Sequence, residues 1–208
     1  FLLYIALSGG AALLHNTGWR ALKSRAGSGI LERGVHFADL ILYFMGNVET
    51  VFAATDIFQR VRTRRMISEN LIPFYGHRVE DEFVEQAEVE IDAEDTAIGV
   101  LTFESGAIGQ LTMSDASHGY NVSVSSVHGS EGTLLLPPSR SGTGPAVRLE
   151  GREEPVAGAE LLALVPDWEM DDISARLWPG ERRIASYDMS FEEIDRKILA
   201  VELQDFAE

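Results

Sequence analysis

The stretch GILERGVHFADLILYFMG, residues 29 to 46, places four polar side chains inside an otherwise apolar run. These four residues, spaced by four, three and four positions, form a polar stripe: Glu32, His36, Asp39 and Tyr43. On an α-helix this spacing brings all four side chains onto one face. Because the remaining positions are apolar nearly all round, the pattern predicts a buried helix whose polar stripe faces a cleft.

Three hypotheses explain ionisable groups in such a helix. In the first, His36 is a core residue that is hydrogen-bonded to a nearby carboxylate, since burial without a partner is costly. In the second, Glu32 and His36 bind one metal ion, although no third protein ligand is obvious nearby. In the third, His36 exchanges a proton with a substrate while Glu32 orients the imidazole. The spacing alone does not choose among them.

The rest of the chain predicts a β-sheet with one wet and one buried face. Between residues 88 and 94, acidic residues alternate with Val89, Ile91 and Ala93, which is the period of a half-buried strand. The runs 96 to 103 and 107 to 114 flank Glu104-Ser105-Gly106, a typical hairpin turn. Three further strands are expected at residues 1 to 7, 48 to 55 and 121 to 128. Half-buried strands are mostly antiparallel, so the predicted fold class is α+β, with an open, mostly antiparallel sheet and helices packed on one face.

The last part of the chain carries a clear helix start. Ser190 and Glu193 form a capping box, and apolar residues then recur on one helical face. Before it, residues 137 to 145 are rich in Pro, Gly and Ser and predict a surface loop. For residues 150 to 188, with Trp168 and Trp178 among acids, packing of an irregular excursion over the sheet is the favoured interpretation, ahead of a binding role.

Composition narrows the classes of function. A net charge of −16, from 33 acidic against 17 basic residues, makes nucleic acid an unexpected partner. No apolar run reaches the roughly 20 residues that span a membrane, so a soluble protein without a membrane partner is expected. The absence of cysteine excludes disulfides and thiolate metal sites, and the cytoplasm is the expected location. The chain starts at Phe1, directly on an apolar run, and is interpreted as a fragment of a longer protein.

One basic cluster stands out in this acidic chain. Its members are Arg60, Arg62, Arg64 and Arg65. A solvated face, or ion pairs with the acidic stretch at 80 to 95, is the favoured interpretation, because runs of surface charge seldom do more. An anionic group of a substrate or the phosphates of a cofactor are the functional alternative.

Four blocks in order resemble the C-terminal substrate domain of the glucose-fructose oxidoreductase/inositol dehydrogenase/MocA family. The family pattern is a Trp-Arg pair, a Gly-rich bend and Asp-x-x-x-His-x-x-Asp entering a helix that ends at Gly. Its counterparts here are Trp19 and Arg20, Gly27 and Gly29, then Glu32, His36, Asp39 and Gly46. The segments EDTAIGVLTFESGAIGQL at 94 to 111 and GYNVSVSSVHGSEGTL at 119 to 134 are also similar to family blocks. Residues 1 to 136 match well and 190 to 208 weakly, with Glu32 standing where the family has Asp.

The resemblance implies that residues 1 to 208 are a C-terminal substrate and oligomerisation domain, without the N-terminal Rossmann domain and the final helix. It implies hydride transfer between NAD or NADP and a secondary alcohol or ketone of a sugar, cyclitol or polyol. In that reaction His36 would take or return the hydroxyl proton, and Glu32 would orient the imidazole of His36. Candidate substrate-binding residues are Arg20, Asp39, His118, Tyr120 and Asn121, and for Asp39 support of the helix is the favoured role. No metal is expected.

Two further expectations follow from the resemblance. The cofactor should bind mainly to the absent domain, because no Gly-x-Gly-x-x-Gly follows a strand in this sequence. The sheet face should pair with a second copy, giving a homodimer or homotetramer. The alternative is a non-catalytic binding or assembly module with the same fold, in which Glu32 marks lost chemistry.

Overall fold

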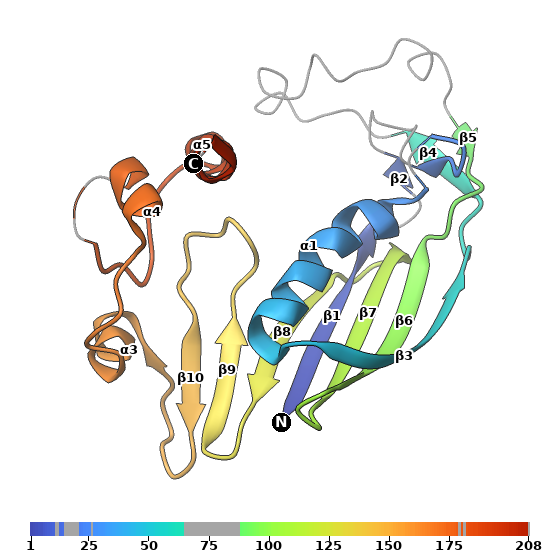
Figure 1. Ribbon diagram of the computed structural model, residues 1–208. Coiled ribbons are helices and arrows are strands. Elements are labelled where there is room, and N and C mark those ends of the chain that lie inside the picture. Colours follow the sequence, from blue (N-terminus) through green and yellow to red (C-terminus); the bar gives the residue numbers. More distant parts are fainter. Residues whose placement is uncertain are drawn as a thin grey trace. The chain divides into compact units, whose positions relative to one another are not determined.

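The computed structural model describes residues 1–10, 13–14, 21–25, 27–64, 88–178, 180 and 182–207. The chain forms two compact units, Phe1–Val124 and Ser125–Glu208, each of which is described by itself (Figure 1). The prediction of one substrate domain over residues 1 to 208 stays a prediction. No described helix is long and apolar enough to cross a membrane.

The first unit is built on a four-stranded run of sheet with the order β1-β7-β6-β3. Its strands are β1 (Leu2–Gly10), β7 (Ile108–Ser117), β6 (Thr96–Phe103) and β3 (Val48–Asp56). β1 and β7 are parallel, whereas β7 with β6 and β6 with β3 are antiparallel. The helix α1 (Gly29–Met45) lies across one face of these strands (Figure 1). A small sheet of β2 (Leu13–Leu14), β4 (Val61–Arg64) and β5 (Glu88–Glu90) completes the unit.

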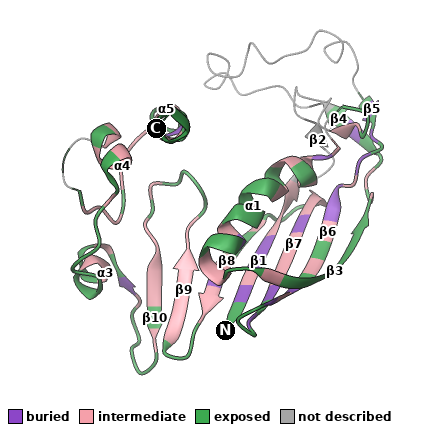
Figure 2. Ribbon diagram, viewed as in Figure 1, coloured by how far each residue is buried: buried purple, intermediate pink, exposed green. Residues whose placement is uncertain are grey.

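Alternation along the central strands separates a buried face from an open one. Leu3, Ile5, Phe103 and Met113 are almost fully buried. Residues one step along the strands point to the opposite face, because side chains alternate across a sheet. There Leu2, Ile98, Val100 and Ile108 are exposed, whereas the edge strand β3 is exposed along nearly its whole length (Figure 2). The sheet is therefore one-faced in these residues, as the sequence predicted.

The β6–β7 hairpin confirms the local turn prediction. The amide of Gly106 donates to the carbonyl of Phe103 at 2.8 Å, and the amide of Phe103 donates to the carbonyl of Ala107 at 3.0 Å. Gly106 has a φ of 80°, in the left-handed region where a residue without a Cβ is least strained. The turn sets the register that opposes Thr102 to Ile108.

The predicted strand at 88 to 94 is correct in burial but too long. Val89, Ile91 and Ala93 are buried between exposed or half-buried acids. Only Glu88–Glu90 forms a strand, which pairs antiparallel with β4. Beyond Glu90 the chain bonds to loops instead, with the amide of Ala93 donating to the carbonyl of Ala21 at 3.2 Å. The period of the pattern reports which side chains are buried, and here it continues past the last ladder pair.

The second unit continues the antiparallel pattern and adds three helices. The sheet order β11-β10-β9-β8 joins β11 (Val156–Ala157), β10 (Ala146–Leu149), β9 (Gly132–Leu136) and β8 (Val122–His128), the last of which begins in the first unit. The helices are α3 (Gly158–Leu164), α4 (Asp172–Leu177) and α5 (Phe191–Ala207). Each strand pair here is antiparallel. The fold class is α+β with an open, mostly antiparallel sheet, as predicted.

Residues 150 to 188 contain two of these helices and pack through few aromatic contacts. Trp178 meets Tyr187 edge to face, with ring centroids 5.9 Å apart, and the ammonium of Lys197 lies 5.6 Å from the centroid of the Trp178 ring. The guanidinium of Arg183 donates to the carbonyls of Leu162 and Val165 at the end of α3. The segment is less irregular than expected because it forms α3 and α4, and its packing role over the sheet stays a prediction.

The capping box at the start of α5 is present as predicted. The amide of Ser190 donates to the Glu193 carboxylate at 2.9 Å, and the amide of Glu193 donates to Ser190 Oγ at 3.3 Å. Hydrogen bonds from the Ser190 amide and hydroxyl lower the pKa of Glu193 below its ordinary value. One turn in, the buried Asp195 pairs with Arg140 at 2.9 Å.

Ser190→Ala is expected to lower the free energy of unfolding by about 1 kcal/mol, since it leaves an amide of the first turn without its acceptor.

The contribution of Glu193 to stability should depend on pH. Because its folded pKa is lowered, its stabilising effect is present above the ordinary glutamate pKa and disappears as the pH falls through the folded value. Melting temperatures of wild type and Glu193→Gln, measured against pH, should differ at neutral pH and converge in acid. A difference that is constant with pH would contradict this assignment.

Candidate functional site

The helix α1 begins and ends where the sequence places it. The Oγ of the buried Ser28 accepts a hydrogen bond from the amide of Leu31 at 2.9 Å, which caps the N-terminus. At the other end, Gly46 has a φ of 77° and its amide donates to the carbonyl of Leu42 at 2.9 Å. A residue with a Cβ would be strained at Gly46, so this position stops the helix.

The prediction that α1 is buried is wrong in these residues. Ile41 is the buried residue of the helix, and its neighbours Leu31, Val35 and Leu42 are each exposed by about half. The physical reason is that one side of a helix is enough to cover this sheet. The exposed apolar side chains lie away from the sheet, whereas Ile30, Phe37, Leu40, Phe44 and Met45 are half-buried (Figure 2).

The polar stripe points away from the sheet rather than into it. Each helical residue turns by about 100°, so Glu32, His36, Asp39 and Tyr43 lie roughly half a turn from the buried Ile41. His36 and Asp39 are exposed, Glu32 is half-buried, and Tyr43 is 81% exposed. The core-histidine hypothesis loses its main support, because His36 is not in the core of this unit. Any cleft over the stripe needs a second wall that lies outside α1 and its sheet.

Among the described residues, none completes a metal-binding group with the polar stripe. Within the described ranges, no cluster of three or more His, Cys, Asp or Glu side chains is placed to hold an ion. Glu32 and His36 by themselves provide two ligands, whereas protein zinc sites use at least three.

The predicted substrate residues after β7 form an exposed turn. His118, Tyr120 and Asn121 are all exposed, and Gly119 between them has a φ of 77°. The side chain of Asn121 lies against the backbone of Gly9, where an added Cβ would come within 2.9 Å of the amide oxygen. Gly9 therefore provides the close approach that seats Asn121 at the end of β1. Arg20, the remaining candidate, lies outside the described residues, as do Trp19, His15 and His77.

The start of α1 and this turn lie at the same end of the sheet. A Cβ built on Gly29 would be 3.1 Å from a carboxylate oxygen of Asp115, near the end of β7. Three residues further along the chain is His118, the first residue of the turn. The structure thus brings the first turn of α1, which carries Glu32, to the strand end that carries the turn. His36 follows about one helical turn, or 6 Å, further along the axis.

Two residues that the sequence interpretation undervalued organise this end of the sheet. Arg62 and Asp95 form a buried ion pair at 2.8 Å, with side chains only 4% and 2% exposed. The prediction that the basic cluster pairs with the acidic stretch is confirmed for Arg62, but the pair is buried rather than solvated. The alternation pattern of the sequence did not predict this burial, because nothing in the local sequence distinguishes a buried arginine from an exposed one.

The hydrogen bonds of this pair lead to several different loops and strand ends. The carboxylate of Asp95 accepts from the amides of Phe58 and Gln59 at 3.0 and 2.9 Å. The guanidinium of Arg62 donates to the carbonyls of Gln59 and Asp115 at 3.1 and 2.6 Å. Charged groups in a low-dielectric interior need such partners, so the network holds together the ends of β3, β4, β6 and β7.

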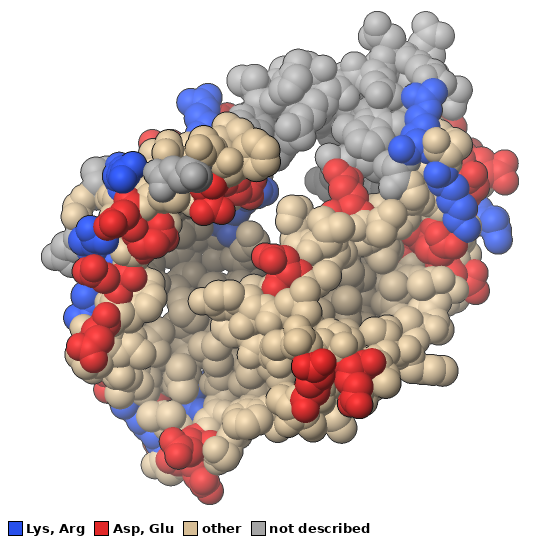
Figure 3. All heavy atoms as spheres, in the orientation of Figure 1, with Lys and Arg blue, Asp and Glu red and all other residues tan. Residues whose placement is uncertain are grey.

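The acidic character of the chain is visible at the surface. On the face shown in Figure 3, acidic side chains are spread among basic and uncharged ones, in keeping with the net charge of −16. The half-buried Glu94 is held in a defined place: its carboxylate accepts from Lys23 Nζ at 2.6 Å, and this bond lowers the pKa of the carboxyl below its ordinary value.

Solved structures similar to this chain are oxidoreductases. The apo form of levoglucosan dehydrogenase matches 99% of this chain and 50% of its own length, with a TM-score of 0.60 and 19% identity. An NAD binding oxidoreductase from Klebsiella pneumoniae matches 98% of this chain and 47% of its own, with a TM-score of 0.59 and 18% identity. Levoglucosan dehydrogenase in complex with NADH and L-sorbose matches 74% of this chain and 37% of its own length, with a TM-score of 0.53 and 22% identity. At these identities the similarity concerns the fold, and the chain spans half or less of each protein.

Family membership rests on the sequence match. No curated protein matches the chain. A family model described as GFO/IDH/MocA C-terminal domain matches residues 5–135, which is more than half of the chain. This range includes α1 with its polar stripe, the Arg62–Asp95 pair and the exposed turn at 118 to 121. The chain therefore belongs to the GFO/IDH/MocA C-terminal domain family, as its sequence motifs predicted.

Proposed function

We propose that this chain is the substrate half of a nicotinamide-dependent dehydrogenase that acts on a secondary alcohol or ketone of a sugar, cyclitol or related polyol. The observation that carries the proposal is the polar stripe of α1, held outward from the sheet at the end where the turn at 118 to 121 lies. Family membership supports the reaction class. Levoglucosan dehydrogenase, of similar fold, is described in complex with NADH and with levoglucosan or L-sorbose, which supports a sugar-like substrate.

In this proposal the chain's own residues bind the substrate and move one proton. His36 takes the hydroxyl proton during oxidation and returns it during reduction. Glu32, one helical turn earlier, orients the imidazole and stabilises its charged form. Asp39 supports the same face of the helix. Arg20, His118, Tyr120 and Asn121 are proposed to bind the hydroxyl groups of the substrate.

The residues of this chain do not fit the dinucleotide itself. Pyrophosphate is usually held by a glycine-rich turn at a helix N-terminus after a strand, and no Gly-x-Gly-x-x-Gly is present in the sequence. NAD or NADP, which supplies or accepts the hydride, is therefore assigned to a separate Rossmann domain of a longer protein. That domain is also proposed to cover the exposed side of α1 and so complete the cleft over the polar stripe.

The open face of the sheet is proposed to form an interface between copies of the protein. Five apolar side chains on the edge and central strands are each at least 42% exposed there: Leu2, Phe52, Ile98, Val100 and Ile108. Exposed apolar patches of more than a few hundred Å² are uncommon on monomers. A homodimer or homotetramer that pairs these faces would bury the patch.

Phe52→Lys is expected to shift the intact protein from oligomer towards monomer, because a charge would replace the most exposed of these side chains, at 78%. Phe58→Lys is the matched control, since Phe58 is 69% exposed but lies beyond the end of β3. Sedimentation velocity over a range of concentrations measures both. A wild-type protein that is monomeric throughout, or an equal shift with Phe58→Lys, would remove the proposed interface.

The second candidate function is a non-catalytic binding or assembly module. The specific observation in its favour is Glu32, which stands where the family has Asp. The two functions are separated by assaying the full-length protein with NAD and NADP against a panel of sugars and cyclitols. Turnover of any of them supports the dehydrogenase. Oligomerisation without turnover of any substrate, together with failure to bind either cofactor, supports the module.

A further inference from the structure

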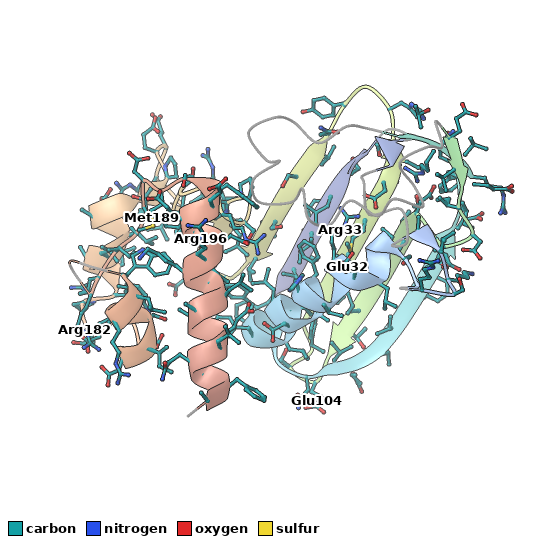
Figure 4. All side chains as sticks on the ribbon, turned by 90° about the horizontal axis from the view of Figure 1, so that it is seen from above. Glu32, Arg33, Glu104, Arg182, Met189 and Arg196 are labelled. Carbon is teal, nitrogen blue, oxygen red and sulfur yellow. The ribbon has the colours of Figure 1, made fainter. Side chains whose placement is uncertain are left out.

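An ion pair ties the first turn of α1 to the sheet. The guanidinium of Arg33 donates to the carboxylate of Asp115 at 2.6 Å, and its Nε donates to the carbonyl of Gly29 at 3.2 Å. The other carboxylate oxygen of Asp115 faces Gly29, the first residue of the helix. Figure 4 shows Arg33 and Glu32 next to each other on this turn. Asp115 therefore contacts the helix at both its first residue and its fifth.

Asp115 is itself anchored to the buried network. Its amide donates to the carbonyl of Asp95 at 2.8 Å, and its own carbonyl accepts from Arg62 at 2.6 Å. Both partners are buried and paired with each other. The backbone of Asp115 is thus held on both sides, so its side chain projects from a fixed point of β7.

The contribution of the Arg33–Asp115 pair to stability should be small. The two side chains are 47% and 31% exposed, and exposed ion pairs add little to the free energy of folding. Their effect on geometry is different, because a helix is stiff over a few turns. A shift or rotation of the first turn moves Glu32, the adjacent residue, and His36, one turn on, by the same amount.

We propose that Asp115 is a positioning residue for the polar stripe: through Arg33 it fixes the height and rotation of the first turn of α1, and so the placement of Glu32 and His36 against the substrate. This inference rests on the proposed dehydrogenase function. A misplacement of about 1 Å in a catalytic constellation is enough to lower a rate about 10²-fold. The charge on Asp115 needs no contact with the substrate for this role.

The test uses the full-length enzyme with its substrate and cofactor. Asp115→Asn and Arg33→Met are expected to lower kcat about 10- to 100-fold, with KM within about threefold and the melting temperature nearly unchanged. Arg33→Lys should keep part of the wild-type kcat. The double variant Arg33→Asp with Asp115→Arg, which exchanges the two charges, should have a higher kcat than either of its single variants. Glu160→Gln is the matched control, because Glu160 pairs with Arg152 at the same 2.6 Å in the other unit. Its kcat should equal that of wild type.

Hydrogen exchange of the amides in residues 30 to 36 provides a readout that does not depend on turnover. Asp115→Asn should increase exchange there, because the first turn loses its tether, and Glu160→Gln should not. If His36→Asn lowers kcat while Asp115→Asn changes neither kcat nor exchange, the positioning role is wrong and the proposed function stands. If His36→Asn leaves kcat unchanged, the proposed function fails and the positioning role falls with it, whatever the exchange shows.

Discussion

His36→Asn in the full-length protein is expected to lower kcat about 10²- to 10⁴-fold, with a smaller effect on KM, because a positioned acid or base contributes about that much to a proton transfer. Asn keeps a polar side chain of similar reach but cannot exchange the proton. Folding should survive, since His36 is exposed on α1 and leaves no buried gap when it is replaced. Steady-state kinetics per folded molecule, in both reaction directions, measure the effect.

Variants of the neighbouring residue refine this expectation. Glu32→Gln should lower kcat less than His36→Asn does. The glutamine keeps the shape of the side chain and a hydrogen bond, and only the charge that stabilises the imidazolium is removed. Glu32→Asp, which restores the residue usual in the family, should be nearly neutral if the role is to orient His36. His128→Asn is a matched control, since His128 is held between Ser126 and Thr133 at 3.0 and 3.1 Å in β8 and β9.

A different result would identify a different role for the stripe. If kcat per folded molecule is the same in His36→Asn as in wild type, the catalytic assignment of Glu32 and His36 is wrong. The family fold would then be present without the family chemistry, because a fold by itself does not specify a function.

Arg62→Ala should be among the most destabilising single substitutions in the chain, at about 3–5 kcal/mol, which is typical for removing one partner of a buried ion pair. The Asp95 carboxylate would keep its amide donors but lose its counter-ion in a site that is 2% exposed. The carbonyls of Gln59 and Asp115 would lose their donors as well. Since whole domains are stable by about 5–15 kcal/mol, a large part of the protein should unfold at elevated temperature.

The control for this prediction is an ion pair of the same kind at the surface. Arg152→Ala removes a pair with Glu160 whose side chains are 40% and 54% exposed, and it should change the free energy of unfolding by less than about 1 kcal/mol. Urea unfolding followed by circular dichroism compares the two variants. Equal and small effects would show that water reaches the Arg62–Asp95 pair. The double variant Arg62→Met with Asp95→Asn should be less destabilised than Arg62→Ala, since no charge stays buried.

The elements that were predicted correctly depend on short-range signals. Gly46 ends α1, Gly106 closes the β6–β7 hairpin, and Ser190 with Glu193 starts α5. Each signal acts through hydrogen bonds or backbone conformations within four residues, so it is visible in the sequence and survives in the fold. The family motifs are also visible in the sequence, and the order of these blocks, rather than the spacing of the stripe alone, singled out His36 and Glu32 as candidates.

The direction of the polar stripe was not visible in this way. A helix that is apolar nearly all round has no single face to assign to the core, and the sequence favoured burial of all of it. Packing on the sheet selected the side centred on Ile41 and left the stripe pointing outward. This outcome depends on which surfaces meet, and no local pattern contains that information.

By itself, the sequence determined the family, the end of α1, the β6–β7 hairpin, the start of α5, and the residues proposed for chemistry. Only the tertiary structure decided that β1 runs parallel to β7, more than one hundred residues away along the chain, and that Arg62 is buried against Asp95. It also brought Arg33 to Asp115 across 82 positions. Such pairings form because the folded chain removes water from charged and apolar groups together, and that burial is shared among distant segments rather than set by neighbours in sequence.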